Sequence, residues 1–133
     1  MRPKIMLKRT LVLVVLALAV SACSKASAST IQDLVADPAA FDGQEVRVTT
    51  GYLSSFEVSV LTSGFAESYP PQAMEPTVWV DAGLSGPCVE EAKGVSWSED
   101  AIASGVFSYE PDGGFGHLGA YKMILENATL SCA

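Results

Sequence analysis

The sequence predicts a mainly β domain, a small closed barrel of five short strands with one short N-terminal helix. Three observations support this prediction. Several segments alternate apolar and polar residues with the period of two that is typical of half-buried strands. Glycines, prolines and Asp-Gly pairs separate these segments, and only one short stretch, near residue 31, has helical spacing. Five strands of this length are enough to close a small barrel.

The helix is expected to begin after Thr30. A threonine can cap a helix N-terminus, and Asp33 stands three positions further on. Ile31 and Leu34 share one face at helical spacing, which predicts that this face packs on the barrel. Pro38 is expected to end the helix after about two turns.

The first strand follows the Asp42-Gly43 turn, and Val46 and Val48 face one side of it. Gly51 inside this strand predicts a bulge or a sharp bend, which is how small barrels curl. The remaining strands are expected over residues 56–62, 77–83, 102–109 and 121–130. The inward side chains of the second and third strands are then Phe56, Val58, Val60, Val78 and Val80.

Two connections separate these strands. The span 64–76 carries three prolines and is expected to be a long loop, because it can form neither a helix nor a central strand. The stretch "YEPDGGFGHLG", residues 109–119, is expected to turn the fourth strand into the fifth.

The N-terminal residues 1–22 have the pattern of a secretion signal. A basic head precedes an uncharged apolar run from Leu11 to Val20, about half the length that a membrane-spanning helix needs. The next four residues, "VSAC" (20–23), resemble the lipobox of bacterial lipoproteins. The resemblance implies cleavage before Cys23, lipidation of its thiol and acylation of the new N-terminus, which together anchor a protein firmly.

Residues 23–29 then form the lipidated cysteine and a short tether, and residues 30–133 form one domain. Ser24 is not the aspartate that retains many such lipoproteins in the inner membrane. The resemblance therefore implies a lipid anchor in the bacterial cell envelope, in the outer membrane and facing the periplasm. An alternative stays open, because Ala26-Ser27-Ala28 satisfies the ordinary A-x-A cleavage rule and would release a soluble protein.

With Cys23 lipidated, Cys88 and Cys132 remain as an even pair in an oxidising compartment, and we expect them to be bonded. Two buried free thiols are the alternative. The sequence predicts no metal site, since two cysteines and one histidine placed this way form no metal-binding motif. No cofactor is expected either.

The charge of the exported part is strongly acidic. Four of the eight Lys and Arg residues lie in the signal, so four remain against all fifteen Asp and Glu. Nucleic acid is an unfavourable partner, because its binding depends on Lys and Arg that neutralise phosphates. A cationic protein fits this surface better.

Three longer stretches resemble a group of small bacterial proteins with an OB-like barrel, several of them exported. They are "LVADPAAFDGQEVRVTTGYL", "VWVDAG" and "GVFSYEPDGGFGHLGAYKMILENATL". The resemblance covers most of residues 31–131 and implies a fold. It implies no activity, because the group has none that could be transferred.

His117 is the only histidine of the chain and lies among four glycines. A catalytic histidine needs a nucleophile to serve or a carboxylate to orient it, and the sequence contains no G-x-S-x-G motif. A structural role, in which the imidazole pins the turn through a hydrogen bond, competes with roles in binding and in catalysis. Aromatic residues in loops are further candidates for recognition, and core positions are expected for Trp79 and Phe107. The loop aromatics are Tyr69, Trp97 and Phe115.

Three functions follow as hypotheses. The leading one is a non-enzymatic, membrane-anchored binding lipoprotein whose ligand is a protein or peptide. The second is an immunity-type or inhibitor lipoprotein that blocks a basic toxin or hydrolase in the periplasm. The third, a small envelope enzyme that uses His117, has the least support in the sequence.

Intact mass spectrometry of the mature protein tests the N-terminal prediction. We expect a chain that starts at Cys23 and carries the mass of a diacylglyceryl group and one further acyl chain. A Cys23→Ser variant should lose this added mass. A chain that starts at Ser29, or one that keeps residues 1–22, would contradict the prediction.

Overall fold

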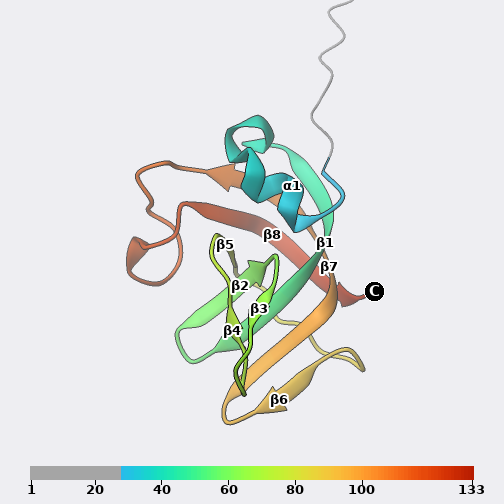
Figure 1. The fold of residues 1–133 in the computed structure, drawn as a ribbon. Coiled ribbons are helices and arrows are strands. Elements are labelled where there is room, and N and C mark those ends of the chain that lie inside the picture. Colours follow the sequence, from blue (N-terminus) through green and yellow to red (C-terminus); the bar gives the residue numbers. More distant parts are fainter. Residues whose placement is uncertain (1–27) are drawn as a thin grey trace, which may run out of the picture.

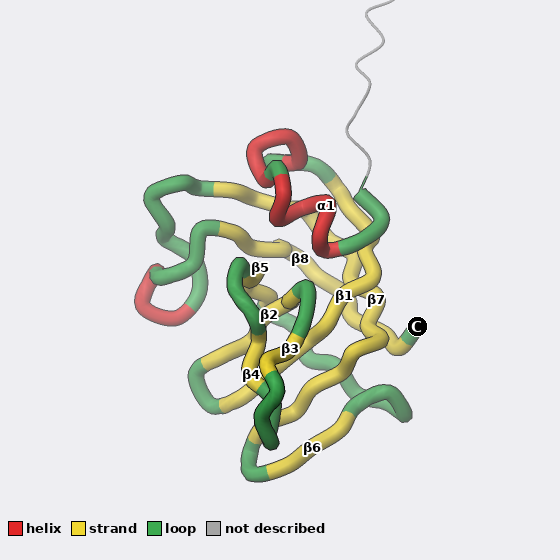
Figure 2. Tube along the Cα trace, viewed as in Figure 1, coloured by secondary structure: helices red, strands yellow, loops and turns green. Residues whose placement is uncertain are grey.

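The computed structural model describes residues 28–133. The expected signal peptide, Cys23 and most of the expected tether lie outside the described residues. In the described part, helix α1 (Ile31–Ala36) lies over one end of a β-barrel, as Figures 1 and 2 show. No helix within residues 28–133 is both long and apolar enough to cross a bilayer.

Five strands form the barrel, and their order is β1-β2-β5-β8-β7, with β7 pairing back onto β1 to close it. Only the β5–β8 pair is parallel, and the other pairs of the barrel are antiparallel. The prediction of a mainly β fold with a small OB-like barrel and one short helix is therefore confirmed. The strands are β1 (Glu45–Ser55), β2 (Val58–Thr62), β5 (Thr77–Val80), β7 (Val95–Tyr109) and β8 (Met123–Cys132).

Several short elements were not expected. β6 (Glu90–Ala92) pairs with β7 beside the barrel, and β3 (Phe65–Ala66) and β4 (Gln72–Ala73) form a separate hairpin within the span expected to be a loop. Strands of two or three residues are too short to show a period, so the sequence gives no sign of them. Two short 3-10 helices complete the fold, at Pro38–Phe41 and His117–Gly119.

The cap of α1 is the one that the sequence predicts. The hydroxyl of Thr30 accepts the backbone N–H of Asp33, and the Asp33 carboxylate accepts the backbone N–H groups of Ser29 and Thr30, each at 3.0 Å. These hydrogen bonds, that of Ser29 first, lower the pKa of the Asp33 carboxyl. The Ser29 carbonyl accepts the N–H of Thr49 at 3.0 Å, so the chain is joined to β1 before the helix begins.

The interior of the barrel is filled from every strand, and α1 closes one end of it. Phe107 is fully buried, as expected, and the inward residues of β5 are buried as well. Phe56 is an exception, since 96% of its surface is exposed. The expectation that it faces inward is wrong, because the chain turns at Phe56 and Glu57 before β2 begins. Val58 and Val60 were also expected to face inward, but they lie in the outer cluster, and Leu61 is the residue of β2 that packs in the barrel core. The core comprises Ile31, Leu34, Phe41, Val48, Tyr52, Leu61, Val78, Val80, Leu84, Ala101, Ala103, Phe107, Met123 and Leu125.

Gly51 lies where β1 bends. The register of β1 against β7 shifts between Thr50 and Tyr52, which confirms the predicted bulge. A Cβ atom at Gly51 would lie 3.0 Å from the side chains of Phe65 and Thr62. Glycine is therefore required at this bend for close approach.

β7 begins at Val95 and not near Ile102, where the sequence analysis placed it. The acidic pair Glu99-Asp100 interrupts the apolar alternation and hides the first half of the strand. As a result Trp97 lies in a strand and not in a loop, and only 7% of its surface is exposed. It is not available as an exposed recognition anchor.

Cys88 and Cys132 form a disulfide, as predicted, with their Cα atoms 5.6 Å apart. The bond joins the end of β8 to the connection that leads from β5 to β6.

Replacing both cysteines by serine should lower the free energy of unfolding by about 4 kcal/mol, because the bond closes a loop of about 45 residues in the unfolded chain. Urea denaturation followed by tryptophan fluorescence measures the loss. Reduction of the unmodified protein is the matched control and should cause a similar loss. A change below about 1 kcal/mol would contradict this role for the disulfide.

Candidate functional site

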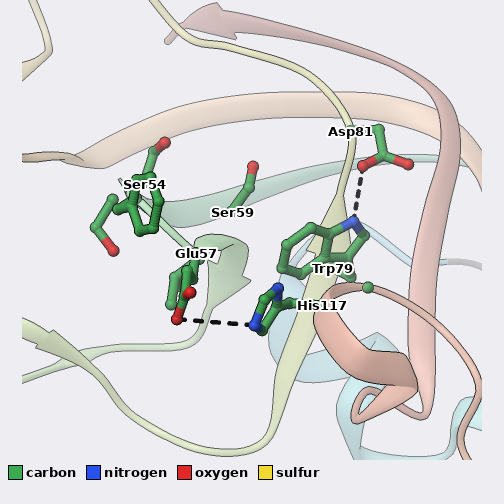
Figure 3. A pocket seen from close by; sticks show the side chains of 10 residues that line it. Ser54, Glu57, Ser59, Trp79, Asp81 and His117 are labelled. Carbon is green, nitrogen blue, oxygen red and sulfur yellow. Dashed lines mark hydrogen bonds and ion pairs between the residues drawn. The ribbon is translucent and has the colours of Figure 1, made fainter.

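A cleft of about 470 Å³ opens on the outer face of β2 and β5 (Figure 3). The turn between β1 and β2, residues 56–57, forms one wall, and the loop between β7 and β8, residues 110–122, forms the other. We call them the β1–β2 turn and the β7–β8 loop. OB-like barrels bind ligands on the face of their second and third strands and with these two connections. The cleft is lined by Ser54, Ser55, Phe56, Glu57, Val58, Ser59, Trp79, Asp81, Gly116 and His117.

Trp79 forms the floor of this cleft. Its neighbours Val78 and Val80 point into the barrel, so alternation along β5 directs the indole outward. The indole Nε1–H donates to Asp81 Oδ1 at 2.8 Å, and the ring packs on Tyr121 with centroids 5.0 Å apart. The expectation that Trp79 belongs to the core is wrong, because the ring is only partly buried and lies on the outer face.

Trp79 belongs to a second apolar cluster outside the barrel. Leu53, Val60 and Trp97 are its buried members. The β3–β4 hairpin covers part of this cluster, since Phe65 and Ala73 pack on it. The span with three prolines therefore covers part of the outer face of the barrel. The part of this face next to the β1–β2 turn stays exposed.

Gly116 brings the β7–β8 loop against the indole. A Cβ atom at this position would lie 2.6 Å from atoms of both Trp79 and Tyr121. The backbone angles, φ 69° and ψ −158°, also belong to a region that only glycine adopts readily. The approach of this glycine sets His117, the next residue, at the edge of the cleft.

Backbone hydrogen bonds give the β7–β8 loop its shape. Phe115 and Tyr121 exchange two of them, at 3.1 and 3.0 Å, and the N–H of Gly114 donates to the carbonyl of Gly119 at 2.9 Å. Phe115 is half-buried in this loop. No hydrogen bond from the His117 side chain occurs within the described part of the chain, so the histidine does not pin the turn in the expected way.

His117 instead faces the opposite wall. Its Nε2 lies 3.7 Å from Glu57 Oε2, with 41% of the histidine side chain and 57% of the glutamate side chain exposed (Figure 3). This distance is too long for a hydrogen bond, and an exposed pair of this kind contributes little to stability. The pair does place one side chain of each wall opposite the other.

A second hollow of about 470 Å³ lies on the other side of the Glu57–His117 pair and is also lined by Leu118, Tyr121 and Lys122. Burial, and then the charge of Glu75, raise the pKa of the Tyr121 hydroxyl. The Tyr121 phenol therefore stays neutral at physiological pH.

Among residues 28–133, no serine hydroxyl donates to His117, and Ser59 Oγ donates to the Val80 carbonyl at 2.6 Å instead. No group of three or more His, Cys, Asp and Glu in this range is placed to hold a metal ion.

The residues singled out from the sequence do not converge on one site. His117 lines the cleft, whereas Tyr69 is exposed on the β3–β4 hairpin and packs edge-on against the buried Trp97, with ring centroids 6.0 Å apart. Glu57 was missed as a member of a site, and Asp81 was considered only as a possible metal ligand. The spacing of Trp79 and Asp81 could have revealed their contact, because residues two apart in a strand share a face.

Comparisons of the chain with protein-family models, curated proteins and solved structures found no match.

Gly116→Ala should lower the free energy of unfolding by about 2 to 4 kcal/mol, because the added methyl group would collide with two aromatic rings. The backbone φ at this position is also one that alanine adopts only with strain. Gly94→Ala is the matched control, since Gly94 has a φ of 76° and open space where the Cβ would lie. It should cost about 1 to 2 kcal/mol. Equal losses in urea denaturation would show that the contact with Trp79 does not hold the loop.

Proposed function

We propose that this protein is a non-enzymatic binding lipoprotein of the bacterial envelope that holds a protein or peptide in the cleft between the β1–β2 turn and the β7–β8 loop. In this proposal Cys23 carries the lipid anchor, in the outer membrane and facing the periplasm. The observation that supports binding most strongly is the pair of exposed apolar side chains beside the cleft. Phe56 is 96% exposed on the β1–β2 turn, and Leu118 is 90% exposed on the β7–β8 loop.

Large apolar side chains with this exposure are costly to keep in water unless a partner covers them. Aromatic side chains such as Phe56 are enriched in protein interfaces. Phe56 and Leu118 stand on either side of the Glu57–His117 pair, so one partner surface could cover both.

The backbone at Leu118 supports the same conclusion. Its φ of 56° lies in the left-handed region, which costs a leucine about 1 to 2 kcal/mol. The side chain gains no burial in return, because it points into solvent. A strained residue that exposes an apolar side chain serves recognition better than it serves stability.

Charge favours a cationic partner. Residues 28–133 contain three Lys and Arg, namely Arg47, Lys93 and Lys122, against fifteen Asp and Glu. The excess of acidic residues also supports a second candidate function. In this alternative the protein is an immunity-type or inhibitor lipoprotein that blocks a basic toxin or hydrolase. Both candidates use the same cleft, and they differ in whether the bound partner loses an enzymatic activity.

The length of the tether limits how far the domain can lie from the membrane, and therefore where it can bind a partner. Six residues between Cys23 and the domain extend to at most about 22 Å. A lipid-anchored form would therefore hold the cleft close to the membrane surface, where a partner in the same envelope compartment can reach it.

Photocrosslinking in the native host tests the proposal. Benzoylphenylalanine at position 56 and, separately, at position 118 should give one and the same adduct, because both side chains flank one cleft. Glu45 at the start of β1 is exposed and lines a different hollow, so the same probe at position 45 is the control and should give no such adduct. Adducts at position 45 alone, or different partners at positions 56 and 118, would refute binding at this cleft.

A further inference from the structure

The charged residues of the cleft are almost all acidic. Glu57 stands in one wall and Asp81 at the end of β5, while His117 is the only basic side chain that lines the space. None of the Lys and Arg residues described by the structure lines this cleft. A hollow lined by carboxylates focuses negative potential and attracts cations.

We propose that the cleft accepts one cationic side chain of the bound protein, an arginine or a lysine, on the face of Trp79 and between the carboxylates of Asp81 and Glu57. This inference rests on the proposed binding function and names the chemistry that the cleft recognises.

The orientation of the Trp79 indole ring favours binding of such a cation. An indole ring attracts a cation to its face, most strongly of the three aromatic side chains. The hydrogen bond from Nε1 to Asp81, at 2.8 Å, fixes the plane of the ring. Donation to a carboxylate also polarises the indole and leaves its face richer in electrons. Packing on Tyr121 supports the ring from outside the cleft.

Asp81 and Glu57 supply the counter-charges. Asp81 is exposed and uses Oδ1 for the indole, and no hydrogen bond to its Oδ2 occurs in the described part of the protein. Glu57 has His117 as its neighbour at 3.7 Å, a separation that leaves its oxygens free to accept hydrogen bonds. A guanidinium group can bond a carboxylate with two parallel N–H groups and stack on an aromatic ring at the same time.

An anionic ligand fits the cleft poorly, because it would meet both carboxylates. A neutral saccharide could also stack on an indole and bond to carboxylates. The excess of acidic residues over the whole domain favours the cation, since a sugar gains nothing from a negative field.

The test uses the full chain in mild detergent and the peptide acetyl-Gly-Arg-Gly-amide. Its neutral counterpart carries citrulline, which has nearly the same shape without the charge. Binding is followed by the NMR signal of the Trp79 indole N–H, with the buried Trp97 as an internal reference. The arginine peptide should shift the Trp79 signal and bind at least about tenfold more tightly than the citrulline peptide.

Matched variants separate charge from shape. Asp81→Asn keeps an oxygen that can accept the indole N–H, and Glu57→Gln keeps the length of the side chain. Each should weaken binding of the arginine peptide about fivefold. Glu45→Gln removes the same charge at the start of β1, outside the lining of the cleft, and should change binding less than twofold.

The inference is overturned by equal binding of the two peptides or by no shift of the Trp79 signal at saturating solubility of the arginine peptide. Unchanged affinity in both cleft variants overturns it as well. It is also overturned if chitotriose, a neutral oligosaccharide, shifts the signal at lower concentration than the arginine peptide. The double variant Glu57→Gln, Asp81→Asn separates the two proposals. If its crosslinks at positions 56 and 118 persist, the cation site is contradicted and the proposed function is not. If those crosslinks are absent in the unmodified protein, the proposed function itself is contradicted.

Discussion

The pairing of β5 with β2 on one side and with β8 on the other is the constraint on which the cleft depends. β5 has only four residues, and its parallel contact with β8 joins Trp79 to Ile124 and Val80 to Leu125. Because β8 begins where the β7–β8 loop ends, this contact brings that loop beside β5. Because β2 begins after the β1–β2 turn, the antiparallel contact of β5 with β2 brings that turn to the same face.

One short strand therefore serves both the core and the site. Val78 and Val80 are fully buried inside the barrel, and Trp79 between them faces outward. Because Trp79 faces outward, Gly116 can pack tightly against its indole ring, and this contact fixes the position of the β7–β8 loop. The position of His117, the next residue, is fixed with it. Stability and recognition are coupled through the same residues, and a change that displaces Trp79 affects both the fold and the cleft.

Local signals in the sequence were enough for much of the fold. Thr30 and Asp33 predict the helix cap, Gly51 predicts the bend, and the two cysteines left beside the expected lipidation site at Cys23 predict the disulfide. The wrong predictions arose where the apolar–polar alternation of the sequence does not end at the same residue as the strand. Phe56 continues the period of two although the chain turns there, and Glu99-Asp100 breaks the period within β7. The cleft could not be predicted, since Glu57 and His117 are brought together by the topology of the barrel and not by any local motif.

Hydrogen–deuterium exchange with the crosslinked partner purified and added back tests the central claim most directly. We expect slower exchange of the backbone amides in residues 54–59 and 114–121, together with β5, and no change in β6. Protection confined to β6 and β7, with the β1–β2 turn and the β7–β8 loop exchanging as in the free protein, would contradict the claim.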